Sequence, residues 1–583
     1  MTIMKIISFD RYQKASKRLL TFVFVLVISS GKAQLFSVMF PDSLGKKPLN
    51  GRLLLILSNN DLAEPRFQVG GGPATQLIFG VDVADWKPGT SLNVSNSAYG
   101  YPIDKLQNVP AGFYFVQVVL HLYERFHRKD GQIVRLPMDR GEGQHWNSAP
   151  GNLYSVPIKI SFNARTRNIY PLTLNRIIPL LEEPKDSKYV KHIRIQSKLL
   201  SEFWGRPIFI GAHILLPEGW ETHPDVKYPL AIFHGHYPSD FSNWRTTPPD
   251  ENLKPDSSER FRITGYNKIT QQEDYNFYKL WTGPGFPRVI AIEIQHANQF
   301  YDDSYAVNSA NIGPYGDAIT YELIPEIEKR FHGIGKGWAR FVYGGSTGGW
   351  ESLAVQVFYP DEYNGCYAAC PDPIDFSSYT VVNIYKDTNA YFLESPFKQT
   401  PRVGMRDWLS RPTSSLKDLN QLELAFGDSS RSGEQWDIWE AVFSPVGKNG
   451  YPARIWDKKT GTIDRNVANY WKEHYDLTHI IQRDWPVLGE KLKGKIHVYV
   501  GEMDNYFLDN AVYSAEDAFK KLQHPECNCE IDYGPRAEHC WNGDHTQPNY
   551  ISRLRYHQMF IRKWAEEVKS RAPLGADLTN WRY

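Results

Sequence analysis

Short apolar runs separated by turn residues dominate the first third of the chain. These runs lie at residues 51–57, 75–81, 112–120 and 153–162, with clusters of Gly, Pro, Asn and Asp between them. Runs of this length and spacing predict β-strands, and several in succession are typical of an immunoglobulin-like sandwich. We therefore expect a β-sandwich-like domain over residues 34–185, a region that carries no catalytic motif.

The pattern changes after about residue 185, where apolar strands begin to alternate with helices. Expected strands lie at 191–196, 207–217, 229–233, 288–294, 339–343, 365–369, 495–500 and 529–533, and the first two are expected to form a hairpin. Helical periodicity covers 317–331, 509–522 and 548–569. This alternation predicts an α/β fold, with a mostly parallel sheet covered by helices on both faces. The α/β domain spans residues 186–583, with an insertion at about 373–490.

The first 33 residues have the features of an export signal. Basic residues precede an apolar run at residues 19–28, and the small residues Gly31 and Ala33 follow it. The run is shorter than the ~20 apolar residues that span a bilayer. We expect a cleavable signal peptide over residues 1–33 and a secreted or periplasmic protein that has no membrane segment after cleavage. An uncleaved membrane anchor is the alternative.

The charge and composition limit the classes of partner. Lys and Arg number 66 against 65 Asp and Glu, a formal net charge of +1. Nucleic-acid binding needs a concentrated positive field, so no nucleic-acid partner is expected. Apolar residues make up 42% of the chain and charged residues 22%, which suits a folded globular protein. Aromatic residues reach 14%, a content that suits β-rich cores or the binding of sugar and aryl rings.

The five cysteines do not predict a disulfide framework. They are Cys366, Cys370, Cys527, Cys529 and Cys540, and their odd number leaves at least one thiol unpaired within the chain. Cys527 and Cys529 are too close in sequence for an ordinary bridge, and no further ligands stand at metal-binding spacing around them. We expect small buried residues here and no metal site.

The strongest motif is a serine between two pairs of glycines. Between the expected strand at 339–343 and a helical stretch lies the G-x-S-x-G sequence Gly344-Gly345-Ser346-Thr347-Gly348-Gly349. In this setting the turn holds the serine in a strained, exposed position above the sheet. The N–H of Thr347, at the start of the helix, is expected to stabilise the oxyanion formed when Ser346 attacks a carbonyl. A glycine-rich structural turn is the alternative.

A second oxyanion donor is expected in the loop after the strand at 229–233. This loop has the sequence His234-Gly235-His236-Tyr237-Pro238. Gly235 lets the backbone approach a substrate closely, so Gly235 and Tyr237 are candidate binding residues. The backbone N–H of His236 or Tyr237 is the candidate oxyanion donor. An ordinary strand-ending loop is the alternative.

Serine is a poor nucleophile unless a base takes its proton, and an acid must orient that base. In this fold the chain order is serine, acid and histidine, with the acid after the next-to-last strand. Asp504 lies just beyond the strand at 495–500 and is the first choice, with Glu502 second. Asp509 is better placed to begin the next helix, where a carboxylate favours the helix dipole.

Two histidines compete for the role of base after the last strand, namely His539 and His545. The base becomes an imidazolium during the reaction. His545 lies close to the start of the final helix, whose positive end disfavours that cation by about 0.5–1 kcal/mol. His539 is therefore preferred.

The segment at about residues 190–570 resembles proteins of the α/β-hydrolase superfamily, and within it the esterases related to esterase D. Besides the Ser346 turn, the matching segments are 192–217 with Phe203-Trp204-Gly205-Arg206, 233–236, 313–317, 501–504 and His539-Cys540-Trp541. The resemblance implies a serine hydrolase that works through an acyl-enzyme without a cofactor or metal. The insertion departs from the family pattern, and it is either a lid or substrate wall or a packing subdomain.

The sequence is compatible with two classes of function. The first is a secreted carboxylic-ester hydrolase acting on a small-molecule or carbohydrate ester. A serine peptidase of prolyl-oligopeptidase type is less suited, because the front region is too short for a propeller at ~40 residues per blade. The second class is a non-catalytic binding protein on a hydrolase scaffold. The set Ser346, Asp504 and His539 favours an enzyme, since a binding module needs none of the three.

Overall fold

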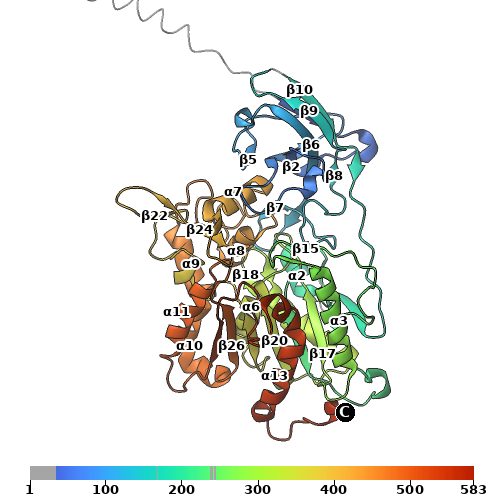
Figure 1. Ribbon diagram of the computed structural model, residues 1–583, viewed down its shortest axis with the longest axis vertical. Helices are drawn as coiled ribbons and strands as arrows, with labels where there is room; N and C mark the ends of the chain where they lie inside the picture. Colours follow the sequence, from blue (N-terminus) through green and yellow to red (C-terminus); the bar gives the residue numbers. More distant parts are fainter. Residues whose placement is uncertain (1–34, 167, 237–240, 242–243) are drawn as a thin grey trace, which may run out of the picture.

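The computed structural model describes residues 35–166, 168–236, 241 and 244–583 (Figure 1). The expected signal peptide at residues 1–33 and the candidate binding residue Tyr237 lie outside the described residues. Within the described part of the chain, no helix is both long enough and apolar enough to cross a membrane.

The front region, residues 35–185, is built from strands alone apart from short 3₁₀ turns. Its strands are β1 (Leu35–Met39), β2 (Leu49–Ser58), β3 (Leu77–Trp86), β4 (Leu92–Val94), β5 (Tyr99–Tyr101), β6 (Gly112–His127), β7 (Ile133–Leu136), β8 (Leu153–Tyr154), β9 (Ile158–Phe162), β10 (Ile169–Thr173) and β11 (Arg176–Ile177). The expected single strand at 153–162 is two strands. Pro157, which cannot donate a ladder hydrogen bond, lies between them.

The strands of the front region form two sheets that share one hydrophobic core. The smaller sheet has the order β10-β1-β4, and the larger has the order β11-β8-β6-β2-β3-β5, with β7 and β9 also paired to β6. Val38 of β1, Leu55 of β2 and Leu172 of β10 are buried in the same cluster. The two sheets therefore pack against each other, whereas the immunoglobulin-like connection of the strands stays a prediction.

A single eight-stranded sheet organises the rest of the chain. Its strands are β12 (Val190–Ser197), β13 (Ile208–Leu215), β14 (Leu230–His234), β17 (Ile290–Gln295), β20 (Arg340–Gly345), β21 (Cys366–Ala369), β26 (Ile496–Gly501) and β27 (Glu530–Gly534). Their order is β12-β13-β17-β14-β20-β21-β26-β27. The pairs β12–β13 and β13–β17 are antiparallel, and every pair from β17 to β27 is parallel. The predicted mostly parallel sheet is present. However, β12 and β13 do not form a tight hairpin, because helix α2 (Lys198–Trp204) connects them.

Helices cover both faces of this sheet. The α-helices are α3 (Tyr266–Thr282), α4 (Tyr315–Ala318), α5 (Ile324–Phe331), α6 (Thr347–Phe358), α7 (Leu416–Phe426), α8 (Gln435–Phe443), α9 (Arg465–Tyr475), α10 (Leu477–Leu492), α11 (Asp509–Phe519), α12 (Asn549–Ser552) and α13 (Tyr556–Arg571). A π-helical segment, Ile319–Leu323, joins α4 to α5 within the helix expected at 317–331. Short strand pairs lie in the loops: β15 (Ser257–Ser258) with β16 (Ile263–Thr264), β18 (Asn308–Ser309) with β19 (Gly313–Pro314), β22 (Phe392–Leu393) with β23 (Thr400–Pro401), and β24 (Val403–Arg406) with β25 (Pro412–Ser415).

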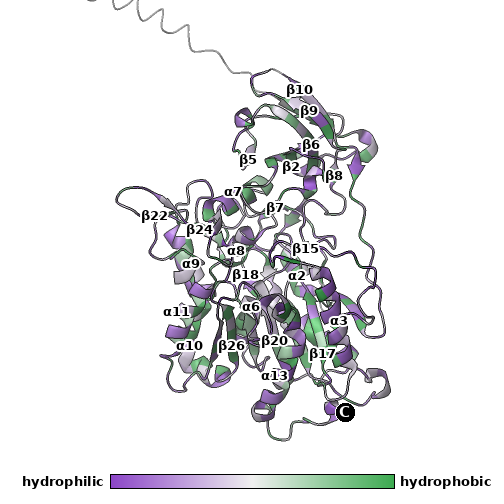
Figure 2. Ribbon diagram, viewed as in Figure 1, coloured by the Kyte–Doolittle hydropathy of each residue, from purple (hydrophilic) through white to green (hydrophobic). Residues whose placement is uncertain are grey.

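The alternation of side chains along β20 explains how the sheet holds a helix on each face. Phe341 stacks on Trp564 of α13, with ring centroids 4.5 Å apart, and Tyr343 lies 5.9 Å from the ring of Phe560 on the same helix. The intervening positions of β20 point to the opposite face, where α6 packs against β20 and β21. Figure 2 shows the hydrophobic colouring concentrated on these central strands.

The insertion, residues 373–490, connects the front region to the sheet. Helix α7 packs on β2, β3 and β5 of the front region (Figure 1). Phe426 and Leu422 of α7 share a buried cluster with Trp146 and Ile56 of the front region. The buried Arg52 of β2 donates hydrogen bonds to the carbonyl oxygens of Leu424 (2.8 Å) and Ala425 (3.0 Å) at the end of α7. Because the last carbonyls of a helix lack partners within it, this arginine caps α7 from another part of the chain.

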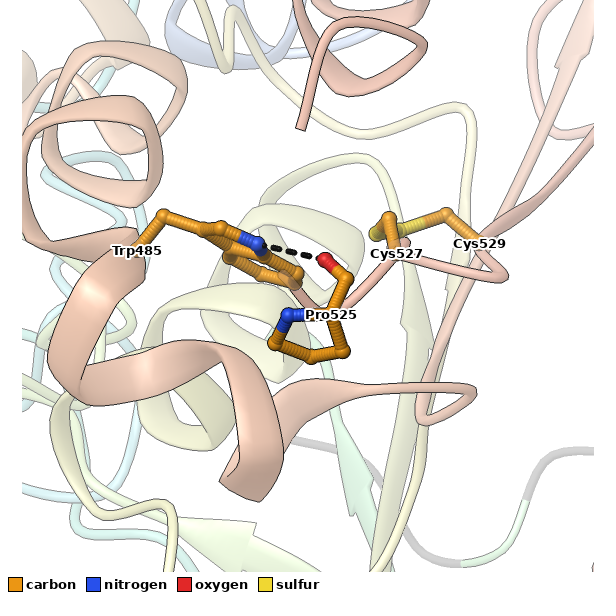
Figure 3. The surroundings of a disulfide bond; sticks show 4 residues. All are labelled: Trp485, Pro525, Cys527 and Cys529. Atoms are coloured by element: carbon orange, nitrogen blue, oxygen red, sulfur yellow. Dashed lines mark hydrogen bonds between the residues drawn. A yellow bond between two sulfur atoms is a disulfide. The ribbon is translucent and has the colours of Figure 1, made fainter. Parts of the chain in front are cut away.

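One expectation about the cysteines is wrong. Cys527 and Cys529 form a disulfide, with their Cα atoms 5.1 Å apart (Figure 3). This separation lies within the ordinary range for bridged cysteines, because the chain bends between the two residues. Beside them, Trp485 Nε1 donates a hydrogen bond to the carbonyl oxygen of Pro525 at 2.9 Å. Cys366, Cys370 and Cys540 carry free thiols.

The cap on α7 gives a first prediction. Arg52→Ala leaves two helix-end carbonyls and the Asp82 carboxylate, 2.9 Å from Arg52 Nη1, without this partner. We expect the free energy of unfolding to fall by about 2 kcal/mol, measured by denaturant titration. Arg125→Ala, at an exposed position of β6, is the matched control and should change it by less than about 0.5 kcal/mol. Equal effects of the two variants would contradict the assignment of Arg52 as a cap.

Candidate active site

Ser346 occupies the sharp turn between β20 and α6. Its backbone has φ 60° and ψ −121°, a conformation that L-residues rarely adopt. The two neighbouring glycines make this turn possible. A Cβ atom on Gly348 would collide with the carbonyl oxygen of His234, and one on Gly344 would collide with the same oxygen. The turn is anchored by the Ser346 N–H, which donates to the carbonyl oxygen of Ala369 at 3.0 Å.

His539 lies in the loop after β27 and points at the serine. Its Nε2 atom is 3.0 Å from Ser346 Oγ, and its Nδ1 atom is 2.7 Å from Asp504 Oδ2. Both His539 and Asp504 are buried. A carboxylate accepts the proton on Nδ1, so Nε2 carries the free lone pair and faces the serine hydroxyl. This arrangement can transfer the serine proton to the imidazole.

The loops that carry the acid and the base are held in place by further hydrogen bonds. The backbone N–H of Tyr506 donates to Asp504 Oδ1 at 2.9 Å, which fixes the carboxylate after β26. The backbone N–H of His539 donates to Asn505 Oδ1 at 3.2 Å. Arg260 Nη2 donates to the carbonyl oxygen of His539 at 2.6 Å. The imidazole therefore has little freedom to leave the serine.

The competing sequence candidates lie elsewhere. Glu502 is exposed to solvent. Asp509 is the first residue of α11 and pairs with Arg406 at 3.0 Å. His545 is 53% exposed, and its Nε2 lies 2.8 Å from Asp532 Oδ2. The structure thus brings Ser346, Asp504 and His539 together and leaves these three candidates outside the cluster.

The two candidate oxyanion donors follow the neighbouring strands β14 and β20. Thr347 is the first residue of α6, whose opening N–H groups have no partner inside the helix. Gly235 and His236 follow β14, whose last residue pairs with Gly344 of β20. His236 and Ser346 line the same cavity. The side chain of His236 is exposed and lies 3.0 Å from Asp302 Oδ1, and the carboxylates of Asp302 and Asp303 raise its pKa.

A cavity of about 610 Å³ opens over the serine. Its walls come from three parts of the chain: the front region, the loops at the carboxyl ends of the central strands, and the insertion. The described lining residues include Trp146, Asn147, Tyr301, Ser346, Asp372, Met405, Leu419, Glu423, Phe426, Glu434, Gln435, Trp436, Trp439, Tyr506 and His539. The insertion therefore forms much of the cavity wall.

Asp372 is a site residue that sequence reasoning missed. Ser346 Oγ lies 3.4 Å from its Oδ1, while its Oδ2 accepts hydrogen bonds from Tyr305 OH at 2.6 Å and Thr347 Oγ1 at 3.1 Å. Burial raises the pKa of the Asp372 carboxyl, although the bond from Tyr305 opposes this. Asp372 lies two residues after Cys370, at the carboxyl end of the strand beside β20. This position in the sequence could have indicated that its side chain lies near Ser346.

Several side-chain groups have the composition of a metal site. In the described part of the chain, the ligand atoms lie within 4.8 Å of one another in each of four sets: Cys370, His539 and Cys540; His234, His296 and Glu351; His236, Asp302 and Asp303; His497, Glu530 and Glu567. Proton transfer from Ser346 requires no metal ion at any of these sets, since the His539 imidazole and the Asp504 carboxylate supply the base and its orientation.

No family model matches the chain, and no curated protein matches it. Solved structures similar to it include a ferulic acid esterase, at 14% identity over 64% of this chain and 99% of that one, with a TM-score of 0.34. Another is an S-formylglutathione hydrolase from Agrobacterium tumefaciens, at 11% identity over 67% and 99%, with a TM-score of 0.32. A third is a ferulic acid esterase from Anaeromyces mucronatus, at 12% identity over 64% and 92%, with a TM-score of 0.27. At these values the likeness assigns no activity to this chain.

Because only His539 contacts Ser346, substitutions of His539 and His545 should have different effects on turnover. His539→Ala removes the only group within hydrogen-bond distance of Ser346 Oγ that can act as a neutral base among the described residues. We expect kcat to fall by about 10⁴-fold or more. His545→Ala breaks an exposed ion pair and should leave kcat within about threefold of the unchanged protein. Turnover of an activated ester by both variants measures the difference, and a larger loss in the His545 variant would contradict the assignment.

Proposed function

We propose that the protein is a serine hydrolase that cleaves carboxylic esters through an acyl-enzyme on Ser346. The observation that supports this most is the continuous hydrogen-bonded relay from Asp504 through His539 to Ser346, at the wall of a cavity. A strained serine, a buried carboxylate and an imidazole between them cost stability, and only a reaction that uses all three explains their presence together.

The proposed reaction proceeds in two halves. His539 Nε2 takes the proton of Ser346 as Oγ attacks the ester carbonyl carbon, and the resulting imidazolium is stabilised by Asp504. The backbone N–H groups of Thr347 and His236 hold the oxyanion. The imidazolium then gives its proton to the leaving alcohol oxygen, so the ester bond breaks and the acyl group remains on Ser346. Water attacks this acyl-enzyme in the second half, with His539 again as base.

The cavity lining favours an uncharged ester that carries a flat ring. Trp146, Phe426, Trp436 and Trp439 present aromatic faces, which suit aryl groups and the apolar faces of sugars. The described lining contains the acids Asp372, Glu423 and Glu434 and no Lys or Arg. Asp372 and Glu423 are buried, whereas Glu434 is exposed to solvent, and further negative charge beside these three acids would be unfavourable. An acylated carbohydrate or a small aryl ester therefore fits this cavity better than an anionic ester.

Two alternatives are weaker. A serine peptidase of prolyl-oligopeptidase type carries a propeller, whereas the described front region forms one three-stranded and one eight-stranded sheet. A non-catalytic binding protein has no use for the relay. We also propose the division into a front domain over 34–185 and a catalytic domain over 186–583, behind a signal peptide that directs the protein to the periplasm or outside the cell.

A serine-directed fluorophosphonate probe tests the nucleophile. The probe should label the folded protein once, at Ser346, and the label should be absent in Ser346→Ala. Alanine keeps the same Cβ, so this variant should retain the melting temperature while losing ester turnover by at least about 10⁴-fold. Matched chromogenic esters and amides with the same acyl group separate esterase from peptidase. Labelling of the alanine variant, or a preference for amides, would overturn the proposal.

The acidic lining predicts selection against charge. Among short aryl and sugar esters of equal size, those with a neutral acyl group should have kcat/KM values at least about tenfold above those with a free carboxylate, because that carboxylate would lie near Glu434 and Asp372. Glu434→Gln should narrow the gap by raising turnover of the anionic ester. An exposed acid far from the cavity, Glu566, provides the control substitution Glu566→Gln. Equal rates for both classes of ester in the unchanged protein would contradict this selection.

A further inference from the structure

Two free thiols flank the candidate base. Cys540 directly follows His539, and Cys370 directly follows the end of β21. The backbone N–H of Cys540 points at the sulfur of Cys370, 3.2 Å away. The two sulfur atoms and a ring nitrogen of His539 all lie within 4.8 Å of one another. Segments 170 residues apart in the sequence thus bring a dithiol to the catalytic centre.

The backbone holds both cysteines in position. Each has a positive φ, 37° for Cys370 and 71° for Cys540, a backbone conformation that residues other than glycine seldom adopt. The N–H of Cys370 donates to the carbonyl oxygen of Tyr499 at 2.5 Å, and Tyr556 OH donates to the carbonyl oxygen of Cys540 at 3.3 Å. The sulfurs lie at most 4.8 Å apart, and rotation about the two Cα–Cβ bonds is the movement that would bring them toward the bond length of about 2.05 Å.

We propose that Cys370 and Cys540 form a disulfide that ties the loop carrying His539 to the carboxyl end of β21. The electron acceptor is a disulfide donor, either oxidised glutathione or a thiol–disulfide oxidoreductase. The Cys540 thiolate attacks one sulfur of the donor and displaces a donor thiolate. The sulfur of Cys370 then attacks Cys540 in the mixed disulfide and displaces the second donor thiolate, which takes up the Cys370 proton. The protein loses two electrons, and the donor becomes two thiols.

The environments of the two sulfurs set this order of attack. The hydrogen bond from Cys370, together with the neighbouring His539, lowers the pKa of the Cys540 thiol well below its usual range, although burial opposes this. Burial raises the pKa of Cys370 instead. Cys540 is also partly exposed, whereas Cys370 is fully buried. The more acidic thiol of the less buried residue, Cys540, therefore meets the donor, and the buried thiol of Cys370 resolves the mixed disulfide.

The disulfide would change the pKa of His539. This step rests on the proposed function, in which His539 is the base. Burial disfavours the charged imidazole, but the Cys540 thiolate and then the Asp504 carboxylate raise the pKa of His539 well above 6.5. A protonated imidazole cannot accept the serine proton, so the reduced protein gains activity only as pH rises through this pKa. Oxidation removes the thiolate charge at Cys540, while the acids Asp504 and Asp372 and the nearby Arg553 keep theirs. The acid limb of kcat/KM therefore moves to lower pH on oxidation.

Cys366 provides a control for the proposed bond, because the chain has five cysteines and Cys366 would be the one left unpaired. Cys527 and Cys529 are already paired, and Cys366 is buried within β21 without a cysteine partner among the described residues. The bond between Cys370 and Cys540 would thus leave one thiol, at Cys366. Cys366→Ser removes a buried thiol of the same strand without touching the catalytic centre.

Thiol counting tests the bond itself. The full chain is produced by export into an oxidising compartment, denatured without reductant, alkylated and analysed by mass spectrometry. We expect one alkylated cysteine, Cys366, and a peptide pair joined through Cys370 and Cys540. Alkylation of Cys366, Cys370 and Cys540 together would overturn the proposal. So would thiols that become reactive only after a chelator is added, because that result indicates a bound thiophilic metal.

The pH profile tests the effect on the base. Reduction with dithiothreitol should move the acid limb of kcat/KM upward by about one pH unit or more in the unchanged protein and in Cys366→Ser. In Cys370→Ser, reduction should cause no shift, because no bond to Cys540 can form and the charge on Cys540 does not change. The disulfide of Cys527 and Cys529 is reduced in this variant too, so an effect of that bond would still appear. An equal shift in Cys370→Ser would overturn the link to His539. A mapped disulfide in a protein without ester turnover would instead reject the proposed function and leave the bond established.

Discussion

The close approach of β14 to the turn after β20 is the constraint on which the site depends. The carbonyl oxygen of His234 lies so near Gly344 and Gly348 that neither position has room for a Cβ atom. This contact forces the backbone of Ser346 into its strained conformation and places the loop of His236 beside it. A parallel strand pair alone would not have this effect. Because of the two glycines, the chain can form a tight turn between β20 and α6, and this turn places the Ser346 hydroxyl at the cavity.

The remaining groups reach the serine from other strand ends. Asp504 follows β26, His539 follows β27 and Asp372 follows β21, all at the carboxyl edge of the parallel part of the sheet. Because the strands of this part run in one direction, loops distant in sequence meet at that edge. Each loop is then tightened by local bonds, such as the one from Tyr506 to Asp504. The sheet supplies proximity, and short-range hydrogen bonds supply orientation.

Local patterns predicted much of this arrangement, because the residues concerned act through their immediate neighbours. The glycines on either side of Ser346 predict the turn. Asp504 and His539 follow apolar runs that predict strands, so their place beyond a strand end could be predicted as well. The features that escaped prediction depend on long-range packing. Trp146 reaches the cavity from a loop without periodicity, and Asp372 becomes notable only once Tyr305 and Thr347 surround it. The bend that allows Cys527 to meet Cys529 is also a property of tertiary structure.

The buried cluster between the front region and α7 has a consequence for how the protein is divided. Phe426 lies in that cluster and also lines the cavity, so one side chain serves both the contact between the two regions and the cavity wall. A fragment that lacked the front region would present Leu422 and Phe426 to water and would have one side of its cavity open. Such a fragment would be prone to aggregate, because apolar side chains buried in the full chain would be exposed. Truncation between the two regions would therefore alter the shape of the cavity as well as the stability of the chain.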